Sequence, residues 1–177
     1  MITTAELWEK ATIFHGHSCP GLVIGYKAAL YAKELLGLTF SRDEEVVCVA
    51  ENDACGVDAI SVILGCSVGK GNLLLRLRGK QAFSFFNRST DKNVRLVFKG
   101  RDFGEISQDE RQEALFNTPH GELFEVKEVS FALPEKARLF RSAACEICGE
   151  TTAESHIRLQ EGKKLCLDCY HPYSRFI

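Results

Sequence analysis

Residues 14–21 read Phe14-His15-Gly16-His17-Ser18-Cys19-Pro20-Gly21, and the predicted fold is built outward from this stretch. Two histidines and a cysteine lie close together, and a proline follows them directly. Proline is favoured at the first position of a helix because its missing N–H would have no partner there. Cys19 is therefore predicted to be an N-cap at the positive end of a helix dipole, where a thiol is shifted toward thiolate. The stretch predicts one wall of a metal-binding or reactive pocket.

The segments on either side of this stretch are predicted to be helices. Residues 3–13 begin with a possible capping box, in which Thr3 precedes Glu6 by three positions. Residues 20–36 carry apolar side chains at helical spacing, and Gly37 is a suitable residue to end that helix. Residues 45–50 are predicted to form a buried strand, because all but the first of them are apolar.

A second polar stretch follows that strand, at residues 51–60. Asp53 is a suitable N-cap for a helix that runs to Leu64 and ends at Gly65. Cys55 then lies in the first helical turn, in the same electrostatic environment as Cys19. If the two helix starts converge, both thiols face one point.

The predicted core site is a metal centre formed by His17, Cys19 and Cys55, which His15 or Cys66 completes or supports. A mixed His/Cys set selects a borderline-soft metal, with zinc the default and another transition metal the alternative. Fewer than four certain protein ligands leave a coordination position for water or substrate.

A bound water would lose a proton near neutral pH, and Asp53, Asp58 or Glu51 could relay that proton. The residues predicted to carry catalysis are Cys19, Cys55, His17 and Asp53.

Several residues near this site also have structural interpretations. A backbone carbonyl could orient His15, which is otherwise a candidate cofactor-binding residue together with Lys70. Lys70 lies in a glycine-rich loop, residues 66–71, whose spacing is not that of a phosphate-binding P-loop. It could bind an anionic ligand or be a solvated turn residue. Cys48 is predicted to be inert core, and Cys66 is either core or support for the metal.

The next part of the chain is predicted to be mainly sheet. Residues 73–78, 82–86 and 94–99 are predicted strands of an antiparallel meander. A capping box at Ser107 opens a helix to about residue 116. Residues 122–132 are again extended, and His120 is predicted to be exposed in the preceding turn.

Four cysteines at the end of the chain predict a structural zinc site. Cys145 and Cys148 form one Cys-x-x-Cys pair and Cys166 and Cys169 a second, separated by residues 149–165. Four thiolates close the zinc tetrahedron and leave no position for substrate. Residues 153–165 suit a hairpin with its turn at Glu161 and Gly162. The predicted organisation is an α+β core at 1–132, a linker at 133–144 and a zinc finger at 145–177.

Composition limits the possible function classes. The chain has 177 residues, a formal net charge of −2 and eight cysteines. The net charge makes nucleic acid an unexpected partner. Because no export signal or long apolar run is visible, the protein is expected to be cytoplasmic, away from membranes, with metal-binding rather than disulfide-bonded cysteines.

The two polar stretches resemble the signatures of the FmdE family, named for formylmethanofuran dehydrogenase. They are residues 14–28 (FHGHSCPGLVIGYKA) and 51–60 (ENDACGVDAI), and residues 65–72 and the terminal module are also similar. The resemblance implies an α+β core with an antiparallel sheet, a treble-clef zinc finger, a homodimer and a metal near His17, Cys19 and Cys55. Only eight residues follow Cys169, so the last helix of a treble clef is predicted to be very short or absent.

Two functions are consistent with this sequence. The core site could bind or act on a small carbonyl or C1 compound. Alternatively, the protein could be a non-catalytic accessory or metal-delivery component whose zinc finger contacts a partner protein.

Overall fold

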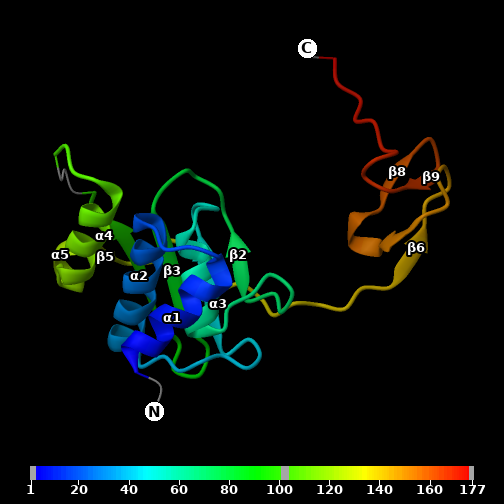
Figure 1. The fold of residues 1–177 in the computed structure, drawn as a ribbon. Coiled ribbons are helices and arrows are strands. Elements are labelled where there is room, and N and C mark those ends of the chain that lie inside the picture. The colour runs from blue at the N-terminus through cyan, green and yellow to red at the C-terminus, as the bar shows by residue number, and fades with distance from the viewer. Residues whose placement is uncertain (1–2, 101–103, 176–177) are drawn as a thin grey trace. The chain divides into compact units, whose positions relative to one another are not determined.

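A computed structural model describes residues 3–100 and 104–175, and the chain divides into two compact units, 1–137 and 138–177. The first is a sheet covered by helices and the second is a small module of short hairpins, so the α+β class is confirmed (Figure 1).

The first unit contains a five-stranded mixed sheet with strand order β2-β1-β3-β4-β5. The strands are β1 (Val46–Ala50), β2 (Leu73–Leu75), β3 (Ala82–Asn87), β4 (Lys92–Phe98) and β5 (Phe124–Lys127). Strands β3, β4 and β5 form the expected antiparallel meander. The prediction that residues 73–78 belong to it is wrong, because β2 is shorter and pairs in parallel with β1. A helix between β1 and β2 returns the chain to the same end of the sheet, which makes the pair parallel.

The helices of this unit are α1 (Thr4–His15), α2 (Pro20–Leu36), α3 (Gly56–Leu64), α4 (Gln108–Asn117) and α5 (His120–Leu123). Both predicted capping boxes form, at Thr3 and at Ser107. Cys19 is the N-cap of α2, as predicted. Among the described residues, none of the helices combines the length and apolar composition needed to span a bilayer.

Two local predictions are wrong. Asp53 is not the N-cap of α3, because that position belongs to Cys55. The side-chain oxygen of Asn52 accepts a hydrogen bond from the Ala54 backbone N–H at 3.2 Å, and this turn delays the start of the helix. His120 is not in an exposed turn but begins the short helix α5 and is half-buried.

Helices α1, α2 and α3 lie on one face of the sheet (Figure 1). Phe83 and Phe85 of β3 are fully buried on this face, in the main apolar core. The alternate side chains, such as Phe86, lie on the opposite face, where Val129 and Phe131 pack against them. Each face of the sheet is therefore covered, which fixes the strand register.

The second unit consists of two short hairpins and a 3-10 turn. Its elements are β6 (Ser142–Ala144), β7 (Thr151–Ala153), η1 (Glu154–His156), β8 (Arg158–Gln160) and β9 (Lys163–Leu165). The hairpin β8–β9 turns at Glu161 and Gly162, as predicted, and both residues have positive φ angles of 51° and 78°. This is the signature of a type I′ turn. The described residues after Cys169 form no helix.

Helices α2 and α3 approach so closely that their backbones touch. A Cβ placed on Gly25 would lie 1.9 Å from the carbonyl oxygen of Gly56, and a Cβ on Gly56 would lie 3.0 Å from the Cα of Gly25. The contact is possible only because neither residue has a side chain. Since Gly25 is in the second turn of α2 and Gly56 begins α3, the contact places the two helix starts side by side.

We expect Gly25→Ala to lower the free energy of unfolding by about 2 kcal/mol. Overpacking costs about 3 kcal/mol, and the better helix propensity of alanine returns only about 1 kcal/mol. Urea denaturation measures the difference. Gly69→Ala is the matched control, because a Cβ at that position meets no atom within 4 Å. Equal stability of the two variants would contradict close packing of α2 on α3.

Candidate metal centres

The core centre brings together His15, His17 and Cys19. One ligand atom of each residue lies within 4.8 Å of the other two. His15 is the last residue of α1, and Gly16 follows it with a positive φ of 91°, which reverses the chain direction. The two imidazole rings consequently lie 4.5 Å apart, between their centroids.

A carboxylate orients His15. Its Nδ1 lies 2.7 Å from Oδ2 of Asp58 in the first turn of α3. The interaction is with a side chain rather than with the backbone carbonyl considered from the sequence. When Nδ1 donates its proton to Asp58, Nε2 keeps a free lone pair for a metal. This Nε2 lies 4.0 Å from Sγ of Cys19.

The two helix-start cysteines lie close together but have different surroundings. Sγ of Cys19 accepts a hydrogen bond from the Leu22 backbone N–H at 3.4 Å, whereas the Cys55 side chain caps no N–H. Burial raises the pKa of the Cys55 thiol, and the neighbouring Cys19 raises it further. A Cβ on Gly21 would contact both sulfurs, at 3.6 and 3.9 Å. Cys55 is therefore next to the cluster of three.

These donors fit a zinc-type ion. Ideal tetrahedral coordination places an imidazole nitrogen and a thiolate sulfur about 3.6 Å apart. The 4.0 Å between Nε2 of His15 and Sγ of Cys19 needs only a small side-chain adjustment. Two imidazoles and one thiolate leave at least one coordination position, which Cys55, water or a ligand would fill.

A cleft of about 560 Å³ adjoins the centre. Its polar lining includes His15, Asp53, Cys55 and Asp58, and its apolar lining includes Phe14, Val57, Val68, Leu73 and Leu75. Sequence reasoning placed Asp53 and Asp58 near the site but missed the apolar wall. The missed signal was an apolar strand, a helix and a second apolar strand over residues 46–75. This pattern is typical of a βαβ unit, which binds ligands at the carboxyl ends of its strands.

Two of the charged candidates have structural partners elsewhere. Both carboxylate oxygens of Glu51 accept hydrogen bonds from Arg95, at 2.6 and 2.9 Å, and these bonds lower the pKa of Glu51. Nζ of Lys70 donates to the backbone carbonyls of Ser41 and Gly65. Glu51 and Lys70 are therefore engaged in structural contacts and are not part of the proposed site.

Cys48 and Cys66 are both completely buried in the main core. Sγ of Cys66 donates to the carbonyl of Val46 at 3.7 Å, and burial raises the pKa of the Cys66 thiol to about 12. A thiol with this environment stays protonated and packs as a small apolar side chain.

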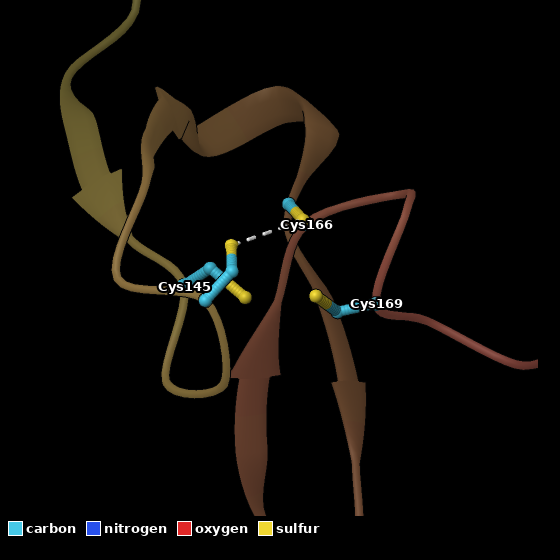
Figure 2. A group of neighbouring side chains, drawn as sticks. Cys145, Cys166 and Cys169 are labelled. Carbon is cyan, nitrogen blue, oxygen red and sulfur yellow. Dashed lines mark hydrogen bonds between the residues drawn. The ribbon is translucent and has the colours of Figure 1, made fainter.

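The second centre is the four-cysteine cluster of the zinc finger. All four sulfurs lie within 4.8 Å of one another, and those of Cys148 and Cys166 are 3.9 Å apart. The edge of a ZnS₄ tetrahedron is about 3.8 Å. Figure 2 shows the sulfurs of Cys145, Cys166 and Cys169 directed toward a common point. Backbone groups of Cys166, Cys148 and Ile147 lower the pKa of Cys145 to about 6, which favours the thiolate that zinc requires.

Two family models match the chain, one over most of each unit. The model described as "FmdE, Molybdenum formylmethanofuran dehydrogenase operon" matches residues 14–132. The second model, the prokaryotic dksA/traR C4-type zinc finger, matches residues 138–175.

Two individual proteins are also similar. A tungsten formylmethanofuran dehydrogenase FmdE-like protein from Syntrophus aciditrophicus has a similar fold, with a TM-score of 0.70 and 24% identity, over 94% of this chain and 91% of that protein. A probable S-adenosyl-L-methionine-binding protein from Archaeoglobus fulgidus is 26% identical over 95% of this chain. The chain spans about half (53%) of the length of that relative.

We expect Asp58→Asn to weaken zinc binding at the core centre by about 10- to 100-fold, because His15 loses the carboxylate that orients it. Competition with a chromogenic chelator measures this affinity. Asp53→Asn is the matched control, since Asp53 lines the same cleft and the change removes the same charge. If both variants lose affinity equally, charge and not imidazole orientation governs binding.

Proposed function

This chain belongs to the FmdE family, and we propose that its core binds a transition-metal ion and presents it to a small organic ligand. His17 and Cys19 are the central ligands, and His15 and Cys55 complete the set. One observation carries the proposal: the ligand atoms of His15, His17 and Cys19 lie within 4.8 Å of one another, and His15 and Cys55 line a cleft large enough for a small molecule.

The ligand class that we propose is a small carbonyl or C1 compound. A zinc-type ion, when bound, polarises a carbonyl oxygen or lowers the pKa of a bound water. Asp58 holds His15 in the orientation that metal binding requires. Asp53 lines the cleft and is placed to accept or return a proton. Val68 and Leu75 supply apolar surface to the cleft for the body of the ligand.

A metal-delivery or accessory role is the alternative. His17 is exposed and Cys19 only half-buried, so the ion would lie close to solvent. An ion in that position can pass to a partner protein without unfolding of the core. The two roles therefore differ in how quickly the bound metal exchanges.

A second ligand class comes from the name of the Archaeoglobus relative. S-adenosylmethionine carries a sulfonium and an ammonium group, and both are cations. Asp53 and Asp58 supply two carboxylates to the cleft, and Phe14, Val68 and Leu75 supply apolar surface for an adenine ring. The cleft is thus chemically suited to this cation as well.

The structural zinc of the finger would hold a surface for protein contacts. Ile147 and Leu167, one in each Cys-x-x-Cys knuckle, are 60% and 49% exposed. In the first unit, Ile13, Phe14 and Val68 are also mostly exposed. We propose that a partner protein binds the knuckles, and that a second copy of the chain covers the apolar side chains at the cleft.

Metal analysis tests the core centre. We expect two zinc ions per wild-type chain, and one in His17→Ala, Cys19→Ser and Cys148→Ser. Cys48→Ala is the control and should keep both ions, because Cys48 is buried in the apolar core. Wild-type zinc content in Cys19→Ser would remove the core centre and leave only the finger. Fast exchange of the core ion against isotopically labelled zinc would favour metal delivery.

Calorimetric titration of the same proteins separates the ligand classes. Formate is the C1 probe, and its binding should disappear in Cys19→Ser together with the core metal. Binding of S-adenosylmethionine that survives Cys19→Ser but weakens in Asp53→Asn would favour the cationic ligand. Binding of neither probe to the zinc-loaded wild type would contradict both ligand classes.

Sedimentation tests the homodimer. We expect twice the mass of one chain for the wild type and a single-chain mass for the double variant Phe14→Ser, Val68→Ser. Removing two apolar side chains from an interface that excludes water costs about 2–4 kcal/mol. Leu139→Ser is the control, because Leu139 is fully exposed in the other unit. A wild type that sediments as one chain would exclude the homodimer.

A further inference from the structure

A second hollow of about 460 Å³ lies between α2 and the start of α5. Its lining is Lys27, Tyr31, Glu34, Pro119, His120 and Gly121. Lys27, Tyr31 and Glu34 follow one another at i, i+4 and i+7, so they share one face of α2. Lys27 is about 12 Å further along α2 than Cys19. The hollow is therefore separate from the core metal centre.

Lys27 is a buried cation with few partners. The residue is only 8% exposed, and its Nζ donates one hydrogen bond, to the carbonyl of Phe116 at 2.9 Å. Among residues 3–100 and 104–175, no carboxylate lies within 4 Å of this ammonium group. An ammonium group out of water costs free energy unless an anion or further acceptors meet it. Burial accordingly lowers the pKa of Lys27.

Two further polar side chains converge on the same hollow. The imidazole of His120 lies 5.4 Å from the Tyr31 ring, between centroids, and its Nδ1 is 3.5 Å from Oε2 of Glu34. A Cβ on Gly121 would lie 3.8 Å from the hydroxyl of Tyr31, so this hydroxyl lies against the same turn. Burial lowers the pKa of His120, and the nearby Lys27 lowers it further.

We propose that this hollow binds the carboxylate of a small monocarboxylate, with Lys27 as the cation and Tyr31 and His120 as hydrogen-bond donors. This site goes beyond the function proposed for the metal centre. The positive charge of Lys27 and the negative charge of Glu34 cancel. A bound monoanion adds one negative charge, which His120 neutralises when it takes up one proton. A dianion such as phosphate would leave one uncompensated negative charge beside Glu34. The ring of Tyr31 and the side chain of Pro119 provide apolar contact for the body of the ligand.

The test is an NMR titration of the zinc-loaded full chain with acetate, observed at the assigned His120 ring. We expect a saturable shift that moves the ring toward its protonated form. Lys27→Met should weaken acetate binding by about tenfold or more, since a hydrogen bond to a charged group is lost. Tyr31→Phe should weaken it as well, and it removes a hydroxyl without changing charge. Inorganic phosphate should bind more weakly than acetate.

Lys99→Met is the matched control for Lys27→Met. Lys99 is exposed and donates to the carbonyl of Gly121 from outside the hollow, so this variant removes the same charge nearby. It should change acetate affinity by no more than about twofold, as a surface charge does. His17→Ala should leave the His120 shift unchanged, which separates this hollow from the metal centre.

Four outcomes would overturn the proposal: no saturable shift at His120, equal losses in Lys27→Met and Lys99→Met, loss of the shift in His17→Ala, or tighter binding of phosphate than of acetate. If Lys27→Met does not fold, Tyr31→Phe decides, and an affinity equal to that of the wild type would then exclude the site.

Discussion

The backbone contact between Gly25 and Gly56 is the constraint on which the core centre depends. Side chains normally hold packed helices 8–10 Å apart, and here a Cβ on Gly25 would lie 1.9 Å from a carbonyl oxygen of α3. Glycine at position 25 lowers the helix propensity of α2, but the close approach of α3 requires it. As a result, the first turns of α2 and α3 lie side by side, with Cys19 at the N-cap of α2 and Cys55 at the N-cap of α3. No loop has to move to bring these thiols together.

The histidines reach the same point by a different route. Helix α1 ends at His15, and the positive φ of Gly16 turns the chain so that His17 lies beside His15. The 2.7 Å contact between His15 and Asp58 then fixes the end of α1 against the start of α3. The end of α1 and the starts of α2 and α3 thus position the donor side chains. The packing of these helices in the core determines the geometry of the donors. Such a site is preorganised before any ion binds, which favours a fixed coordination geometry over an adaptable one.

Local signals in the sequence predicted most of the elements. Helix ends were visible in Thr3, Cys19 and Ser107, and the turn of the last hairpin was visible in Glu161 and Gly162. The failures were contacts between distant residues or competition among neighbours. The parallel pairing of β2 depends on how α3 crosses the sheet, and the choice of Asp58 as the partner of His15 depends on helix packing. Asn52 displaced Asp53 as the residue that organises the start of α3, and both residues are suitable for that role from sequence alone.

The two metal centres differ in what holds their donors, and this difference bears on their roles. In the finger, all four sulfurs come from two short knuckles in a unit with a small core of Cys145, Leu165 and Cys166. So little apolar burial cannot order forty residues, and the free energy of zinc binding must supply the rest. In the first unit, Cys19 and Cys55 pack against a large apolar core, and Asp58 holds His15. Because this fold does not need an ion for stability, an ion held there under the proposed function would be free to exchange a ligand for a substrate. Four thiolates leave a structural zinc no coordination position for a substrate, whereas an ion bound as we propose beside the 560 Å³ cleft would keep one.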